Sequence, residues 1–224
     1  MFGDNTYMNG NGFVAPGTPG DASRLEEGSK LGSFYMWKFA GFDDDGGFLL
    51  YNKDGEVIPA AQKTENDKQY IGNYYPKVMI GWSHTLTYKN WDLGINLRSW
   101  LNYDVYNTFN MYFGIQGQGN FNLLKDAYGK FDHIKGEKQI CDYYLEDGSF
   151  LKVDAISLGY TLSMRKYTKF VDRIRIYGTI GNPFIITKYS GMNPEVNVTG
   201  WDKGTERFWY VDDVPTLYPV VRTY

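Results

Sequence analysis

Residues 77–88 read KVMIGWSHTLTY, and their side chains alternate between two kinds along the whole stretch. The first kind is large and mostly apolar and comprises Val78, Ile80, Trp82, His84, Leu86 and Tyr88. The second kind is mostly small or polar and comprises Met79, Gly81, Ser83, Thr85 and Thr87. Successive side chains of a β-strand point to opposite faces, so this pattern predicts a strand with one apolar face.

The same alternation resumes after a tight turn at Lys89–Asn90 and predicts a second strand from Trp91 to about Tyr103. Its apolar face would hold Trp91, Leu93, Ile95, Leu97 and Leu101. Its polar face would hold Asp92, Gly94, Asn96, Arg98 and Asn102, with Trp100 as an exception. Both strands are as long as a membrane crossing needs, roughly 9–11 residues, whereas strands of soluble domains average about 5–6.

Further strands are predicted outward from this pair. They cover Ser33–Gly41 (with Tyr35, Trp37 and Phe39 on one face), Phe150–Leu162, Arg173–Ile180 and a last strand that begins at Tyr218. A small hairpin is expected at Gly47–Tyr51 and Glu56–Ile58. Connections are long after residues 41, 103 and 181 but short at 89–90 and 165–169, as in outer-membrane barrels with short periplasmic turns and long extracellular loops. The predicted fold class is all-β, an open arc of an antiparallel transmembrane β-barrel.

The composition favours strands over helices as the membrane-crossing elements. Of the 224 residues, 18% are aromatic, including 20 Tyr, and such residues are typical of barrel interface girdles. Mean hydropathy is -0.46, and no run of about 18 apolar residues exists, which excludes a transmembrane helix. The net charge of -3 leaves no basic surface for nucleic acid, so no nucleic-acid partner is expected.

No catalytic, cofactor or metal site is predicted. Cys141 is the only cysteine, so an intrachain disulfide and a CxxC motif are both excluded. His84 and His133 are the only histidines, and His84 falls on the apolar face of its strand. Residues 43–47 lack the spacing of a calcium-binding loop and predict a solvated turn. We therefore expect a protein that is not an enzyme and needs no cofactor.

A set of short motifs resembles one known family. Residues 67–77 read DKQYIGNYYPK, with Gly81 four residues on, which is similar to the IGN-x-x-PK-x-x-x-G stretch of the SusC/RagA family of TonB-dependent outer-membrane transporters. Similar motifs follow in the order of that family, at Asp104–Asn107, Asp147–Leu162, Arg175–Val196 and Tyr218–Thr223. Together they cover residues 32–224.

The resemblance implies a C-terminal fragment of such a transporter, one not expected to function alone. Residues 1–31 would be an incomplete strand or periplasmic connection, and residues 32–224 the C-terminal portion of the TonB-dependent receptor β-barrel with its last strand truncated. TonB-dependent transporters close with about 22 strands and a plugged lumen, so the plug and most of the barrel would belong to a missing N-terminal part. The start, MFGDN, also lacks the pattern of a signal peptide.

The family also implies a location and partners. The location would be the outer membrane of a Gram-negative bacterium, such as a member of the Bacteroidota, with membrane lipid around the barrel. The implied activity is uptake of glycan oligosaccharides or peptides together with a SusD-like surface lipoprotein. TonB would be contacted through the missing N-terminal part.

Aromatic side chains in the two long loops are the candidates for contact with substrate. They are Tyr103, Tyr106, Tyr112, Phe113, Tyr189, Trp201, Trp209 and Tyr210. Aromatic rings can stack on sugar rings, while neighbouring Asn or Asp side chains hydrogen-bond the hydroxyl groups. The alternative is that these rings pack against each other, or against the lipoprotein, and thereby order the loops.

Two other fold hypotheses share the alternating strands. A secreted β-sandwich that binds carbohydrate would also expose aromatic loops, but its strands would be shorter, and such domains rarely have several loops beyond about 15 residues. A small self-contained porin-like barrel would need an even set of strands that closes on itself.

Overall fold

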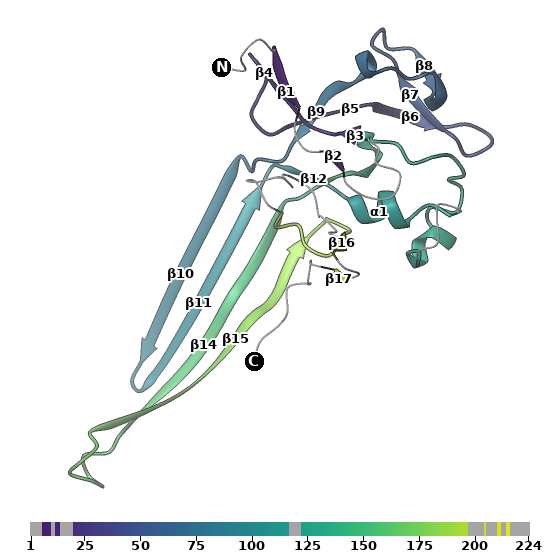
Figure 1. Ribbon diagram of the computed structural model, residues 1–224. Coiled ribbons are helices and arrows are strands. Elements are labelled where there is room, and N and C mark those ends of the chain that lie inside the picture. The colour runs from purple at the N-terminus through teal and green to yellow at the C-terminus, as the bar shows by residue number, and fades with distance from the viewer. Residues whose placement is uncertain are drawn as a thin grey trace.

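The computed structural model describes residues 6–9, 12–13, 20–116, 122–196, 204, 210–211 and 214–215. Its largest element is an open, antiparallel, four-stranded sheet in the order β10 (Val78–Tyr88), β11 (Trp91–Leu101), β14 (Phe150–Ser163) and β15 (Arg173–Thr187). The four strands lie side by side and run from a loop-rich end to two turns at the other end (Figure 1). The strands predicted at these positions are therefore confirmed, and the sheet is not closed into a barrel.

The register of the sheet brings the apolar side chains of all four strands onto one face. Ile95 of β11 pairs with His84 of β10 and with Ile156 of β14, and Ile156 pairs in turn with Ile180 of β15. This face is open to the surroundings: Trp82 is 49% exposed and Ile176 62% exposed. An exposed apolar patch of this extent marks a contact surface for lipid or protein.

Strand β15 is longer than predicted, because the expected loop at Asn182 is only an interruption of the ladder. Pairing skips from Ala155↔Gly181 to Val153↔Phe184, which leaves Asp154 opposite Asn182 and Pro183. Asn182 has a positive φ of 49°, and proline cannot donate to a ladder, so both residues suit a bulge. Beyond the bulge, β15 continues to Thr187, and its apolar side chains lie on the same face of the sheet as before.

The single strand predicted over Ser33–Gly41 is wrong, because it breaks at Trp37. Strand β5 (Ser33–Met36) pairs with β9 (Gln69–Asn73). Strand β6 (Lys38–Phe42) belongs to another sheet with the hairpin β7 (Phe48–Tyr51) and β8 (Val57–Pro59), which the sequence did predict. Trp37 itself forms a parallel bridge with Cys141, and its indole N–H donates to the Thr64 carbonyl at 2.8 Å.

Short elements fill the remaining described residues. The paired strands are β1 (Tyr7–Asn9) with β4 (Arg24–Glu26), β2 (Gly12–Phe13) with β3 (Gly20–Asp21), β12 (Asp104–Tyr106) with β13 (Leu145–Asp147), and β16 (Tyr210–Val211) with β17 (Val214–Pro215). The helical turns are α1 (Thr108–Phe113), η1 (Ala60–Gln62), η2 (Glu65–Asp67), η3 (Lys125–Tyr128) and η4 (Asp142–Tyr144). Across the described ranges, every helix is too short or too polar to cross a bilayer. The strand predicted at Tyr218 lies outside the described residues.

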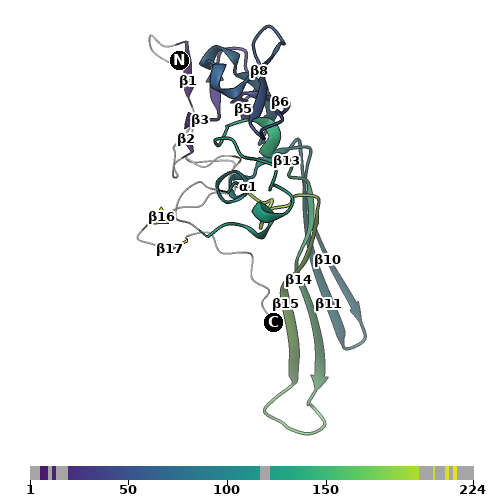
Figure 2. The same cartoon turned by 90° about the vertical axis from the view of Figure 1, so that its right-hand side faces the viewer.

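The described residues of the segments 20–75 and 102–149 (all but 117–121) pack together at one end of the sheet, and we call this unit the head (Figure 1, Figure 2). The predicted strand at 33–41 and the long loops expected after residues 41 and 103 thus share one hydrophobic core. Its fully buried side chains include Phe34, Met36 and Leu50 from the first segment and Tyr106, Met111, Ile115, Ile134, Ile140 and Cys141 from the second. Burial of these side chains stabilises the head by removing apolar surface from water.

A second, smaller cluster joins the head to the sheet and explains the position of Trp100. The Trp100 ring lies 5.7 Å from the Phe150 ring and 6.0 Å from the Tyr103 ring, measured between centroids. Tyr103, Val105, Phe150, Tyr189 and Val196 make up the buried part of this cluster. Trp100 breaks the alternation because its end of β11 contacts the head.

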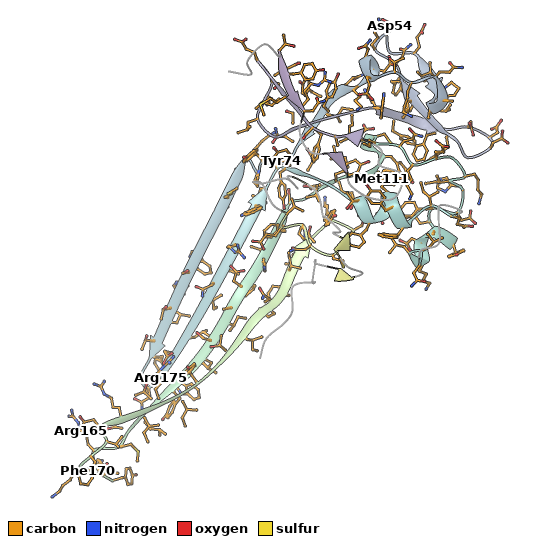
Figure 3. All side chains as sticks on the ribbon, viewed as in Figure 1. Asp54, Tyr74, Met111, Arg165, Phe170 and Arg175 are labelled. Carbon is orange, nitrogen blue, oxygen red and sulfur yellow. The ribbon has the colours of Figure 1, made fainter. Side chains whose placement is uncertain are left out.

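We expect Met111→Ala to destabilise the head. Met111 is fully buried, and its sulfur accepts a hydrogen bond from the Tyr106 hydroxyl at 3.3 Å (Figure 3). Removing a buried methionine side chain costs about 2–5 kcal/mol. Hydrogen exchange of the α1 amides should accelerate accordingly, whereas Met8→Ala, at a position 56% exposed, should leave the exchange unchanged. Equal exchange in the two variants would contradict this account of the core.

Candidate functional site

The polar face of the sheet is made of small and hydrogen-bonding side chains. Ser83 pairs with Asn96, Gly94 pairs with Ser157, and Ser157 pairs with Thr179 across the four strands. None of these side chains is fully buried. The hydroxyl and amide groups on this face can hydrogen-bond water or a polar solute along the sheet.

A four-residue ion cluster occupies the polar face close to the head. Arg98 and Lys152 are directly paired in the ladder, and like charges in that position repel. The Arg98 guanidinium donates to both carboxylate oxygens of Asp154, at 2.6 and 2.9 Å, and to Glu195 at 2.6 Å. The Lys152 ammonium donates to Glu195 at 3.0 Å. Two carboxylates thus balance two cations.

The bulge in β14 and β15 makes this arrangement possible. Asp154 is an extra residue of β14 relative to β11, and its carboxylate accepts from the Arg98 guanidinium. The Lys152 side chain is only 6% exposed. A nearly buried ammonium needs carboxylate partners, because the loss of one partner leaves a charge without compensation.

Glu195 comes from a segment that follows β15 and crosses the polar face, residues 188–196, which we call the crossing segment. The Tyr103 hydroxyl donates to the Pro194 carbonyl at 2.7 Å. The Glu146 carboxylate of β13 accepts from both the main-chain N–H and the hydroxyl of Ser190, each at 2.7 Å. The crossing segment is therefore bonded to the head at Ser190 and Pro194 and to the sheet through Glu195.

A second ion pair lies at the far end of the polar face, where Figure 3 labels Arg175. The Arg175 guanidinium of β15 donates to Asp92 of β11 at 3.0 Å. The pair passes over Gly159 of β14, where a Cβ atom would lie 2.5 Å from Asp92 Oδ2 and 2.6 Å from Arg175 Nη2. Glycine is needed here because any side chain would separate the two charges.

The aromatic residues predicted to contact substrate lie mostly inside the protein. Tyr103, Tyr106, Tyr112 and Tyr189 are buried, and Phe113 packs against the head core. Trp201 and Trp209 lie outside the described residues, and Tyr210 lies in β16. Burial of the four tyrosines favours the alternative that these rings order the loops, and their contact with substrate stays a prediction.

The acidic run at residues 43–47 forms a turn. One carboxylate oxygen of Asp43 accepts from the Asp45 N–H at 3.0 Å and from the Gly47 N–H at 2.6 Å. The carboxylate thereby closes the connection between β6 and β7, as expected of an Asx turn. Within the part of the chain that the structure describes, no three His, Cys, Asp or Glu side chains are grouped to hold a metal.

Comparison with known proteins gives two relatives and a set of similar structures, while no family model matches the chain. TonB-dependent receptor SusC of Bacteroides thetaiotaomicron is 28% identical over an alignment of 207 residues that covers 85% of this chain and 20% of that receptor. TonB-dependent receptor P3 of Formosa agariphila is 24% identical over an alignment of 197 residues that covers 77% of this chain and 19% of that receptor. The chain spans about a fifth of the length of these relatives.

Two of the similar structures show the same assembly in different states. The RagAB peptide importer in its open-open state matches with a TM-score of 0.68 and 20% identity, over 99% of this chain and 24% of that chain. Its closed-closed state matches with a TM-score of 0.64 and 23% identity, over 87% and 23%. These matches show the fold, and with the two relatives they confirm the resemblance to the SusC/RagA family, whose members are transporters and not enzymes.

We expect Glu195→Gln to release the crossing segment. The change leaves Lys152 with Asp154 at 3.8 Å as its remaining carboxylate among the described residues. Hydrogen bonds to charged groups contribute about 1.5–3 kcal/mol, so trypsin should cleave after exposed Lys188 at least tenfold faster. Asp172→Asn is the control, because its pair with Arg165 is more than 70% exposed on both sides and such pairs contribute about 0–1 kcal/mol. Unchanged cleavage in the Glu195 variant would contradict the anchoring role.

Cys141 should be unreactive in the folded head. Burial raises the pKa of the Cys141 thiol to about 12, and the thiolate is the reactive form. A thiol reagent at pH 8 should therefore modify Cys141 only after unfolding in denaturant, while a cysteine placed by Thr168→Cys in an exposed turn should react at once. Rapid modification of native Cys141 would show that the head opens.

Proposed function

We propose that this chain, as part of a SusC/RagA-type TonB-dependent transporter, forms a section of the wall of an outer-membrane β-barrel. The apolar face of β10, β11, β14 and β15 faces lipid, the polar face lines the lumen, and the head lies on the extracellular side. The observation that supports this most directly is the continuous exposed apolar face over four long strands.

The dimensions of the sheet suit a bilayer. β10 and β11 each have 11 residues, which at about 3.4 Å per residue extend over roughly 35 Å. A strand of that length tilted by about 45° spans an apolar band of about 25 Å, as in outer-membrane barrels. At the turn end, the rings of Trp91 and Tyr160 lie 4.6 Å apart between centroids, in the position of an aromatic girdle.

The two edge strands of the sheet need further strands to pair with. β10 and β15 each have one side without a strand partner among the described residues. Unpaired main-chain groups in lipid cost several kcal/mol each, so only closed barrels are stable there. The rest of the transporter wall would supply the adjoining strands, in keeping with relatives about five times as long as this chain.

The substrate and partners of the transporter are part of the proposal. The activity is uptake of glycan oligosaccharides or peptides, with a SusD-like lipoprotein above the head and TonB contacted through another part of the protein. Similarity to the RagAB peptide importer supports peptides and a two-component assembly. The chain contributes the polar face and the crossing segment, which would meet the solute inside the lumen.

A secreted β-sandwich receives less support. In a sandwich, the apolar face of one sheet packs against a second sheet. The face that holds Trp82, Ile95 and Ile176 is not covered by any other sheet in the described part of the chain.

A pair of lysine substitutions tests the assignment of the two faces. Ile95→Lys would place a charge on the apolar face near the middle of the strand, at a cost of about 2–4 kcal/mol in lipid. Ser83→Lys places the same charge at nearly the same depth on the polar face and should change stability by less than about 0.5 kcal/mol. The stability of each variant is measured on the complete protein that contains this chain. The protein is inserted into vesicles and unfolded in urea, and the folded fraction is read from its heat-modifiable gel mobility. Equal effects would contradict the proposed orientation.

A further inference from the structure

The β14–β15 hairpin extends beyond its neighbours in the sheet. The β10–β11 hairpin ends at Tyr88 and Trp91, and Trp91 pairs with Tyr160. β14 continues past Tyr160 for three more residues, to the pair Ser163↔Arg173. Residues 164–172 then form the connection, which we call the distal turn, at the tip of the sheet farthest from the head (Figure 1, Figure 3).

The distal turn has a defined internal structure. The Met164 N–H donates to the Asp172 carbonyl at 2.9 Å, and the Tyr167 N–H donates to the Met164 carbonyl at 2.8 Å. The Thr168 hydroxyl oxygen accepts from the Val171 N–H at 3.0 Å. These bonds order the main chain of the turn, and most of its side chains are exposed.

Two aromatic side chains of the distal turn are exposed to an unusual degree. Tyr167 is 79% exposed and Phe170 is 99% exposed. Both lie on the same turn, beyond the exposed apolar residues Leu162 and Ile174 that end the lipid-facing surface. A phenyl ring left entirely in water is unfavourable, whereas the membrane interface accommodates aromatic rings.

The distal turn also gathers positive charge in a chain whose net charge is -3. Arg165 pairs with the single acidic residue of the turn, Asp172, at 3.2 Å. Lys166 and Lys169 of the turn are exposed, as is Arg173, the adjoining first residue of β15. No ion pair joins these three residues to a carboxylate within the described residues. Exposed cations beside exposed aromatic rings complement an anionic lipid surface.

The length of the extension agrees with the depth of lipid headgroups. Three residues of strand extend about 10 Å, or about 7 Å along the membrane normal at the usual tilt of a barrel strand. Each headgroup layer is about 5–7 Å thick outside the hydrocarbon core. If the Trp91–Tyr160 girdle marks the edge of the hydrocarbon, the distal turn reaches the phosphates.

We propose that the distal turn binds anionic phospholipid headgroups on the periplasmic side of the outer membrane. Lys166, Lys169 and Arg173 contact the phosphates, while Tyr167 and Phe170 insert at the interface. This inference rests on the proposed function, because it requires the apolar face of the sheet to lie in lipid and the short turns to face the periplasm.

Lipid binding by the complete protein that contains this chain tests the proposal. The protein, folded in neutral detergent, is titrated with dioctanoyl-phosphatidylglycerol or dioctanoyl-phosphatidylcholine, and bound lipid is counted by native mass spectrometry. Each basic residue at an anionic surface contributes about fivefold in affinity. The Lys166→Gln/Lys169→Gln variant should therefore bind phosphatidylglycerol at least tenfold more weakly, with phosphatidylcholine binding unchanged, and Lys166→Arg/Lys169→Arg should retain wild-type affinity.

Two further variants separate the contribution of the turn's lysines from that of lysines elsewhere and from that of the aromatic rings. Lys30→Gln/Lys53→Gln removes two exposed lysines from the head and should leave both lipid affinities unchanged. Tyr167→Ser/Phe170→Ser should weaken binding of both lipids, because the rings contact the interface irrespective of headgroup charge.

Insertion of the protein into vesicles, monitored by its heat-modifiable gel mobility, distinguishes failure of the headgroup site from failure of the proposed barrel function. Protein that inserts, but whose preference for phosphatidylglycerol survives Lys166→Gln/Lys169→Gln, overturns the headgroup site and leaves the barrel intact. Protein that does not insert overturns the proposed function and the headgroup site together. If Lys166→Gln/Lys169→Gln weakens binding to isolated peptidoglycan and leaves lipid affinity unchanged, the distal turn contacts the cell wall and the lipid proposal is overturned.

Discussion

The register of the four-stranded sheet is the constraint on which the other features depend. A slip of one residue between two strands would turn every side chain of one strand to the opposite face. The unpaired residue Asp154 of β14 lies opposite the unpaired residues Asn182 and Pro183 of β15. Pairing resumes beyond them with the apolar side chains of both strands on the same face of the sheet as before. The apolar face stays continuous, and Arg98 and Lys152 stay on the other face with their carboxylates.

The head is held to this sheet by carboxylates as well as by packing. Glu146 of the head binds Ser190 near one end of the crossing segment, and Glu195 near the other end binds Arg98 and Lys152 of the sheet. Around them, Trp100, Tyr103 and Phe150 form the apolar cluster at the junction. The directional hydrogen bonds of the carboxylates and the packing of the aromatic cluster together hold the crossing segment against the polar face.

Local alternation was enough to predict the bounds of β10, β11 and β14 closely, because the polarity of successive side chains follows the environment of the two faces of a strand. The prediction ended β15 too early because Asn182–Pro183 has the composition of a turn, and only pairing with β14 shows it as a bulge. The break at Trp37 and the ion pair of Arg98 with Glu195 depend on contacts about a hundred residues away in sequence. Such contacts leave no local pattern, and the aromatic loop residues were for the same reason ambiguous between packing and ligand contact.

The bridge between Trp37 and Cys141 joins segments on either side of the β10–β11 hairpin, about a hundred residues apart in the sequence. The β10–β11 hairpin has a two-residue turn and can form by itself, whereas the head requires two segments that flank this hairpin in the sequence. Contacts across such separations close slowly, so the hairpin should form first and the head should assemble on it. Once assembled, the head joins the end of β9 to the start of β12 at the base of the hairpin, which hinders the two strands from sliding along each other.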